Sequence, residues 1–247
     1  MDRLIYTAAT GASHILHQQA TVSNNLANVN TPGFRASIDA FRSVPLQGEG
    51  LPTRTFVVDS TAGSDFTPGV IQQTGRALDI ALDGKGWIAV QDANGNEAYT
   101  RNGSLQMSPN GVLQTRGGLT VLGDAGPLSI PPDTSVTIAK DGTLSTVPTT
   151  NQKNGVIAVG RLKLTNPPEE QMVRGEDGLF RTRDGNPAEA DAGVTVVGGS
   201  LEGSNVNTVE AMVNMITLAR QFDTQMKLLQ SADENARRAS SVLNINS

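Results

Sequence analysis

The sequence contains no cysteine, few aromatic residues and no long apolar run. Without cysteine the chain has no disulfide, no thiolate ligand for a metal and no cysteine nucleophile. No apolar segment reaches the roughly 18 residues that a transmembrane helix needs, and the amino-terminal segment has no basic region followed by an apolar one. We therefore expect neither a membrane-inserted segment nor a cleaved secretory signal.

An excess of basic residues is also absent. The 247 residues include 19 Lys and Arg against 24 Asp and Glu, which gives a formal net charge of −5. Such a chain offers no polycationic surface for a phosphate backbone, so nucleic acid is not an expected partner. The length is ample for a substantial core, in one large domain or two smaller ones.

Charge is missing altogether between Leu4 and Phe34. Within this stretch, residues recur at alternating steps of three and four, and only Gln19 interrupts their apolar character: Ile5, Ala8, Ala12, Ile15, Gln19, Val22, Leu26 and Val29. This spacing predicts a helix with a heptad seam. The helix should end near Asn30, because Pro32 disfavours helical geometry at the preceding residue and Gly33 can adopt a positive φ.

A second face of this helix is polar but neutral, with His14, His17, Thr21, Asn24 and Asn28 again at steps of three and four. A helix with one side in water normally carries charge on that side. Neutral amides and hydroxyls suit burial against other protein, because they cost less to desolvate than charges do. We therefore expect this helix to be covered on more than one side, among neighbouring subunits. The alternative is that the asparagines only terminate the helix.

The carboxy-terminal part of the chain mirrors the first. A three-four spacing, interrupted by Asp233 and Ser240, runs through Met212, Met215, Ala219, Phe222, Met226, Leu229, Ala236 and Leu243. It predicts a helix over 208–243, with Asn207 at the N-cap. Two helices with matching seams, one at each end of the chain, are expected to pair with each other as a coiled coil.

Period-two segments separated by Asn-Gly, Gly-Gly and Asp-Gly turns occupy the middle of the chain, which predicts a β-meander. The expected strands are 87–91, 97–100, 104–107, 112–115, 119–122, 134–139, 156–164 and 178–183. The predicted fold class is α+β, with the terminal helices paired in a coiled-coil inner domain and a central all-β outer domain. Its expected parts are an N-terminal helix (1–35), an extended connector (36–73), a β-rich domain (74–200) and a C-terminal helix (201–247).

Metal sites find little support in the sequence. His14 and His17 are three residues apart on a helix, but no carboxylate or thiolate lies in that helix to complete a site. Asp92, Asn94 and Asn96 begin like a calcium loop, yet the glycine and glutamate that such a loop needs later are missing. We expect a hairpin turn there, and neither a metal nor a cofactor.

Enzymatic function is the weaker interpretation. Asp79, Asp83 and Glu97 are carboxylates of the kind that glycosidases use in pairs, so a glycosidase stays open as an alternative. Aromatic residues, which would grip a sugar, make up only 4% of the chain. We expect a protein that is not an enzyme.

Three long motifs carry a family resemblance. NNLANVNTPGFR (24–35) and LEGSNVNTVEAMVNMITLARQFDTQMKLLQSADE (201–234) resemble the two terminal signatures of the axial proteins of the bacterial flagellum, the rod and hook subunits. TGRALDIALDGKGWIAVQ resembles their central β-region. Within the family, MDRLIYTAATGA, GRLKL and EAMVNMITLAR are most similar to the proximal-rod members.

The resemblance implies a structural subunit of the proximal rod, which transmits torque and conducts exported subunits as a helical tube across the periplasm. The implied partners are other proximal and distal rod proteins and the flagellar type III export apparatus, which exports such chains without a cleaved signal peptide. The implied assembly residues are Asn24, Asn25, Leu26, Ala27, Asn28, Thr31, Pro32, Gly33, Phe34, Leu201, Glu202, Ser204, Asn205, Val206, Met212, Met215, Phe222, Met226 and Leu229. A β-rich phage-tail or fibre subunit is the structural alternative.

Overall fold

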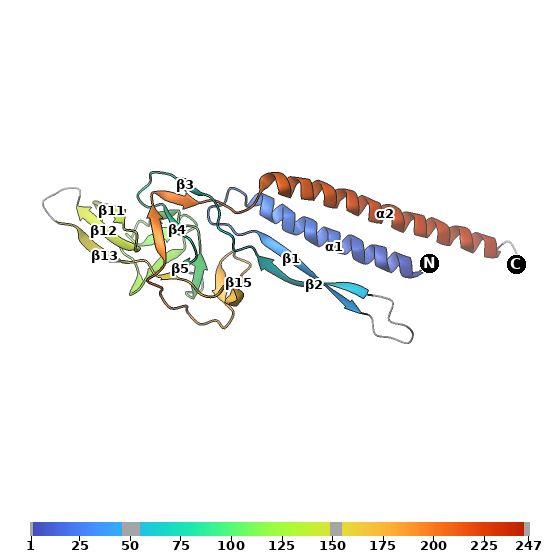
Figure 1. Ribbon diagram of the computed structural model, residues 1–247, viewed down its shortest axis with the longest axis horizontal. Helices are drawn as coiled ribbons and strands as arrows, with labels where there is room; N and C mark the ends of the chain where they lie inside the picture. The colour runs from blue at the N-terminus through green and yellow to red at the C-terminus, as the bar shows by residue number, and fades with distance from the viewer. Residues whose placement is uncertain (1, 46–54, 149–154, 245–247) are drawn as a thin grey trace. The chain divides into compact units, whose positions relative to one another are not determined.

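The computed structural model describes residues 2–45, 55–148 and 155–244. It has two helices, one near each end of the chain, and a mostly β region between them, so the fold is α+β (Figure 1). The chain divides into two compact units, which we call the helical unit (Met1–Asn28, Ser37–Gly63 and Val206–Ser247) and the β unit (Val29–Ala36 and Ser64–Asn205). Neither helix has an apolar window in its described residues that could span a bilayer.

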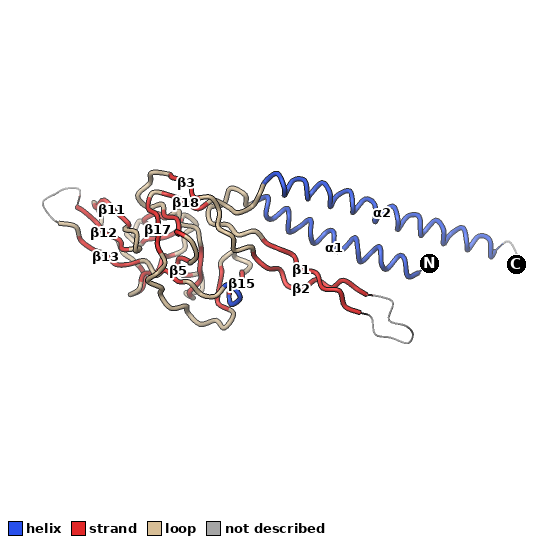
Figure 2. The backbone as a smooth tube through the Cα atoms, viewed as in Figure 1, coloured by secondary structure: helices blue, strands red, loops and turns tan. Residues whose placement is uncertain are grey.

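The helical unit consists of α1 (Asp2–Ala27), α2 (Thr208–Asn244) and a two-stranded sheet of β1 (Ser37–Pro45) and β2 (Thr55–Ser64). Both helices lie side by side, and β1 also contacts α1 (Figures 1 and 2). The two strands lie in the region for which the sequence predicts an extended connector. The α1 helix ends three residues before the predicted end at Asn30.

Asparagine side chains form hydrogen bonds at the end of α1 and at the start of α2. The side chain of Asn28 donates a hydrogen bond to the carbonyl oxygen of Asn24, 2.9 Å away, just beyond the last helical residue of α1. At the start of α2, Oδ1 of Asn207 accepts hydrogen bonds from the backbone N–H groups of Val209 and Glu210 at 3.1 and 3.3 Å. These bonds satisfy donors that a helix start leaves open, so the predicted N-cap is confirmed.

The α1 seam has the register that the sequence predicts, because Ala8, Ala12 and Ile15 are buried. The predicted α2 seam is wrong at alternate positions. The observed seam of α2 consists of the buried or half-buried residues Ala211, Met215, Leu218, Phe222, Gln225, Leu229, Ala232 and Ala236. The predicted seam residues Met212, Ala219 and Met226 are exposed. Adjacent apolar residues fit the three-four spacing equally well, so apolarity alone does not select the buried one.

The β unit contains most of the strands and one short 3-10 helix, η1 (Glu169–Gln171). Its strands are β3 (Ile71–Gln73), β4 (Ile80–Asp83), β5 (Trp87–Gln91), β6 (Glu97–Thr100), β7 (Leu105–Met107), β8 (Leu113–Thr115), β9 (Thr120–Gly123), β10 (Gly126–Pro127), β11 (Thr134–Ile138), β12 (Thr143–Pro148), β13 (Ile157–Arg161), β14 (Leu164–Thr165), β15 (Met172–Arg174), β16 (Phe180–Thr182), β17 (Thr195–Gly198) and β18 (Ser200–Glu202).

The main sheet has nine strands in the order β15-β16-β6-β5-β9-β8-β7, with β10 paired to β9 and β14 to β5. The predicted simple meander is therefore wrong, because β5 pairs with both β6 and β9, and β6 is not a neighbour of β7. The single strand expected over 156–164 is two strands. Of these, β13 joins β11 and β12 in a separate sheet, while β14 joins β5.

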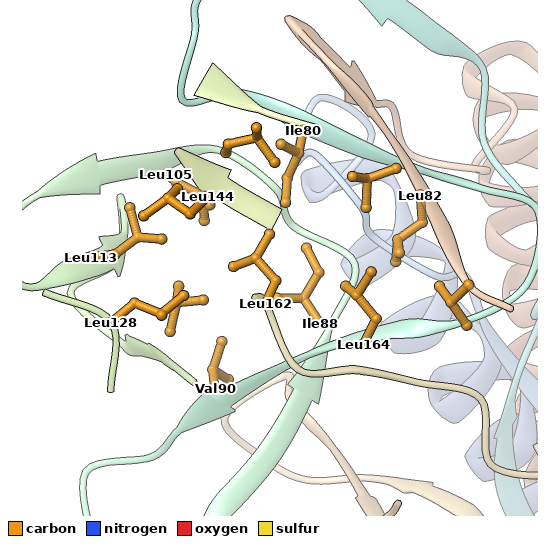
Figure 3. Packing of buried hydrophobic residues seen from close by; sticks show 14 of the residues in the cluster. Ile80, Leu82, Ile88, Val90, Leu105, Leu113, Leu128, Leu144, Leu162 and Leu164 are labelled. Carbon is orange, nitrogen blue, oxygen red and sulfur yellow. The ribbon is translucent and has the colours of Figure 1, made fainter. Parts of the chain in front are cut away.

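Strand β5 separates two apolar clusters. Ile88 and Val90 belong to the larger cluster, which includes leucines from several strands (Figure 3), while Trp87 and Ala89 belong to a smaller aromatic cluster. Successive side chains of a strand point to opposite faces, so both faces of β5 are buried. Each fully buried leucine contributes about 1.5–3 kcal/mol, so this double burial anchors the unit.

Candidate assembly surfaces and buried charge cluster

A buried ion cluster joins three distant parts of the β unit. Arg35, Arg101 and Glu202 are at most 4% exposed. Nη2 of Arg35 donates to Oε1 of Glu202 at 2.7 Å, and Nε of Arg101 donates to Oε2 at 2.7 Å. Oε1 also accepts from the backbone N–H of Gly69 at 2.8 Å. One carboxylate thus holds two guanidinium groups and a third segment of the chain.

The second guanidinium is further fixed by backbone oxygens. Arg101 donates from Nη1 to the carbonyl of Gly86 and from Nη2 to that of Gly84, each at 2.8 Å. Burial lowers the pKa of Arg101, and the proximity of Arg35 lowers it further, while Glu202 acts in the opposite direction. Such a cluster is stable only while its hydrogen bonds are complete, because desolvating each ion is expensive.

The segment that follows α1 is anchored beside this cluster. Gly33 adopts φ +69 and donates its N–H to the carbonyl oxygen of Glu202 at 2.8 Å. The ring of Phe34 is buried, and the guanidinium of Arg174 lies 4.5 Å from its centroid. The predicted turn at Pro32 and Gly33 therefore delivers Phe34 and Arg35 into the β unit.

Several residues expected at an assembly interface have partners inside the β unit. Leu201 and Glu202 lie on β18, paired with β3. Asn205 accepts a hydrogen bond from the N–H of Ala36 at 2.7 Å and donates to the carbonyl oxygen of Asp65 at 2.9 Å. Half-buried positions are Thr31, Pro32, Ser204 and Val206. The bonds of Asn205 therefore join three segments of the β unit, at Ala36, at Asp65 and at Asn205 itself.

The neutral face of α1 is partly covered by β1 of the same chain. Asn25 bonds both backbone groups of Ser37, donating from Nδ2 to its carbonyl oxygen at 2.9 Å and accepting its N–H at Oδ1 at 2.8 Å. Thr21 donates to the carboxylate of Asp39 at 2.8 Å. His14 packs edge-on against the ring of Phe41, with centroids 5.6 Å apart. Asn25, next to this face, thus bonds the backbone of β1, while Thr21 and His14 of the face contact side chains of the same strand.

The remaining expected assembly residues of the helices differ in exposure. Leu26 on α1 and Asn28 just after it are half-buried, whereas Asn24 and Ala27 are exposed. On α2, Met215, Phe222 and Leu229 are half-buried along the seam, whereas Met212 and Met226 are exposed. The helices therefore supply residues both to their mutual contact and to the surface.

An exposed apolar stripe lies near the start of α2, on positions that the seam does not use. Val209, Met212, Val213 and Ile216 are 72%, 50%, 56% and 55% exposed. Their spacing of three and four places them on one face of the helix. No charged residue occurs between Glu210 and Arg220. Sequence reasoning found Met212 but missed the other three, because it counted a single stripe.

The candidate chemical sites are engaged in local structure. Asp92 accepts the backbone N–H groups of Asn94 and Asn96 at 2.9 Å, as in a hairpin turn. Asp79 pairs with Arg76 at 3.0 Å, Glu97 pairs with Lys163 at 2.8 Å, and Asp83 is exposed at the end of β4. Within the described parts of the chain, no group of three or more histidine, aspartate or glutamate residues could hold a metal ion.

Three family models match this chain. "Flagella basal body rod protein" matches residues 5–35, "Flagellar hook protein FlgE/F/G D1 domain" residues 81–146, and "Flagellar basal body rod FlgEFG protein C-terminal" residues 197–242. The flagellar basal-body rod protein FlgF of Escherichia coli is 49% identical, over 99% of this chain and all of its own length. The chain belongs to the FlgF family of flagellar basal-body rod proteins.

Other relatives agree with this assignment. FlgF of Salmonella typhimurium is 47% identical, over 99% of this chain and all of its own length. FlgG of Buchnera aphidicola subsp. Schizaphis graminum is 30% identical, over 93% of this chain and 95% of its own length. The two terminal family models cover most of α1 and most of α2, the helices that carry the surfaces described above.

Proposed function

We propose that this chain is a structural subunit of the flagellar basal-body rod, placed in its proximal part, and that it assembles through its terminal helices with other rod subunits. The observation that carries the proposal is the exposed apolar stripe of α2. Apolar residues scattered singly on a surface are ordinary, but a contiguous face without charge is typical of a contact with another protein. Similarity to rod proteins over 99% of the chain favours a rod subunit over a tail or fibre subunit.

The two helices have the spacing of a coiled coil, and we propose that they pack as one in the assembled rod. Buried and half-buried positions of α2 alternate by three and four from Ala211 to Ala236, and the broader buried face of α1 includes a set with the same spacing from Ile5 to Leu26. This is the periodicity at which two helices keep one seam in contact. The stripe of α2 lies off that seam, so a neighbouring subunit can cover it while the seam stays closed.

The exposed part of the neutral face of α1 supplies a second proposed contact. Asn24 of this face is exposed, as is the nearby Ala27, and no charged residue occurs between Leu4 and Phe34. Contacts of this kind, repeated from subunit to subunit without closing into a ring, generate a helical tube. Such a tube would transmit torque and conduct exported subunits. The role is structural, with no catalysis, metal or cofactor.

Export and location follow from the same role. A rod subunit that lies in the periplasm has to leave the cytoplasm, and we propose that the flagellar type III apparatus exports this chain without cleaving a signal peptide. Helices that lack partners are only marginally stable, so α1 and α2 are suited to passing through a channel unfolded and ordering on assembly.

A charge placed on the α2 stripe tests the proposal. Met212→Lys puts a cation on an exposed position, so the isolated chain should keep the unfolding transition of the unmodified protein. In the rod the same cation would be buried without a partner, which is strongly unfavourable. We expect loss of rod incorporation and motility in cells that carry this variant as their only copy.

The matched control is Gln221→Lys, an exposed position of the same helix away from the stripe. It adds the same charge and should assemble normally, because surface substitutions generally change stability by no more than about 0.5 kcal/mol. Normal motility with Met212→Lys, or equal loss with both variants, would refute the stripe as an assembly surface.

A further inference from the structure

A pocket of about 420 Å³ opens beside the buried ion cluster of the β unit. Its lining combines guanidinium groups from Arg35 and Arg101, the Lys85 side chain and the rings of Phe66 and Trp87. Positive groups and aromatic walls in one cavity suit a small organic anion. The strands and loops that supply these residues all belong to the β unit.

The guanidinium of Arg35 is incompletely bonded. The side chain is 2% exposed, and its Nη2 donates to Glu202, but Nε and Nη1 have no acceptor among the described residues. A buried donor without an acceptor loses its hydration without compensation. The Arg35 side chain therefore has hydrogen-bonding capacity that its own fold leaves unused.

The charge balance of the cluster also favours an anionic ligand. Two buried guanidinium groups share the single carboxylate of Glu202, which leaves one positive charge in excess. Two other carboxylates line the pocket, but neither forms an ion pair with Arg35. Glu169 pairs with Lys85 at 2.8 Å, and Asp65 accepts the backbone N–H of Thr67 at 2.9 Å. The cluster therefore carries a net positive charge where Arg35 and Arg101 line the pocket.

We propose that this pocket binds the carboxylate group of an organic acid, with the free N–H groups of Arg35 as donors and Trp87 and Phe66 as apolar walls. The aromatic lining favours an organic carboxylate over an inorganic anion, because the remainder of the ligand then buries apolar surface. Two sources have this chemistry: a free small acid, and an acidic side chain of an adjoining subunit.

The single tryptophan of the chain, Trp87, is a built-in reporter. Purified full-length protein is titrated with benzoate, and emission is recorded with excitation at the red edge of tryptophan absorption. We expect a saturable change with benzoate, and at least a tenfold weaker response with benzamide, which has the same shape without the charge. Equal responses to benzoate and benzamide, or no saturable change, would overturn the proposal.

Two variants locate the site. Asp65→Asn removes a carboxylate from the lining without touching the ion cluster, so benzoate should bind about fivefold more tightly because a like charge has gone. Arg35→Lys keeps a positive charge but loses the free guanidinium donors, so saturation should be lost. If Arg35→Lys does not fold, Asp65→Asn decides alone, and unchanged affinity in that variant contradicts binding in this pocket.

A separate arm distinguishes the two sources. Association of the chain with purified adjoining rod subunits is measured with and without saturating benzoate. Weaker association assigns the carboxylate to a neighbouring subunit, whereas unchanged association together with benzoate binding assigns it to a free acid. Binding of benzoate to the isolated chain does not depend on assembly, so the site and the proposed rod function can fail separately.

Discussion

Replacing Gly33 by alanine should destabilise the β unit strongly, because two independent penalties fall on this position. Its φ of +69 lies in the left-handed region, which costs a residue with a Cβ about 1–2 kcal/mol. An added Cβ would also lie 2.3 Å from the carbonyl carbon of Arg101, 2.5 Å from its oxygen and 2.5 Å from the nitrogen of Asn102. These are backbone atoms, which cannot rotate out of the way.

The size of the effect follows from this geometry. Ordinary contact begins at 3.4 Å, so the segment carrying Gly33 has to shift by about 1 Å or the Arg101 backbone has to retreat. Either movement disturbs the 2.8 Å bond from Gly33 to the carbonyl of Glu202. Overpacking of this kind costs about 1–3 kcal/mol, so the two penalties together should reach about 2–5 kcal/mol, a large part of a typical domain stability.

Gly75 is the matched control, because it has the same backbone conformation without the clash. Its φ is +74, and an added Cβ would meet no atom within 4 Å. Gly75→Ala should therefore cost only the conformational part, about 1–2 kcal/mol. Urea unfolding followed by the fluorescence of Trp87, which lies in the same unit, gives both values. Equal losses of unfolding free energy in the two variants would show that the close approach of Gly33 to the Arg101 backbone adds no cost to the substitution.

Three further predictions concern polar groups. Glu202→Gln should cost about 3–5 kcal/mol in urea unfolding, because two buried guanidinium groups lose their counter-charge; a loss below about 1 kcal/mol would contradict this. The hydrogen bond from Arg181 lowers the pKa of Asp92, so its stabilisation is complete above about pH 4 and is lost as pH falls further. Unfolding free energy in an Asp92→Asn variant should accordingly fall less steeply between about pH 4 and pH 2 than in the unmodified chain, and an identical slope would exclude this contribution. Asn25→Ala removes two hydrogen bonds to Ser37, so the free energy of local opening at the start of β1 should fall by about 1–3 kcal/mol and its amide hydrogens should exchange faster. Asn24→Ala, at an exposed position, should leave this exchange unchanged.

Local patterns allowed much of the β unit to be predicted. Strands β5 and β6 have the predicted bounds, 87–91 and 97–100. The signals for them, alternating side chains and an Asn-Gly turn, both lie within a few residues of the sequence. The pairing order of the strands was not predictable in this way. That β9 lies next to β5 depends on which apolar faces the cores bring together, and no short segment contains that information.

The ion cluster lies beyond sequence reasoning for a related reason. Arg35 and Glu202 are separated by 167 positions, and Arg101 and Glu202 by 101. A lone arginine in a loop gives no signal of burial, since arginine is usually exposed. The motif containing Arg35 was recognised, but the sequence predicted an assembly residue at Glu202 without its buried partners.

The lack of charge along α1 can have two causes, cover by the same chain and cover by a neighbouring subunit. The lack of charge from Leu4 to Phe34 predicted cover on more than one side, and the structure supplies part of that cover from the same chain, through the bonds of Asn25 to the backbone of Ser37. A charged residue at position 25 could not both donate to a carbonyl and accept an N–H, so neutrality there needs no neighbouring subunit. Asn24 is different, because it is exposed and none of its side-chain atoms is required by the described fold. If the absence of charge at that position reflects selection for assembly, Asn24 and the stripe of α2 have to be covered by other subunits, while the asparagine one position later belongs to the fold itself.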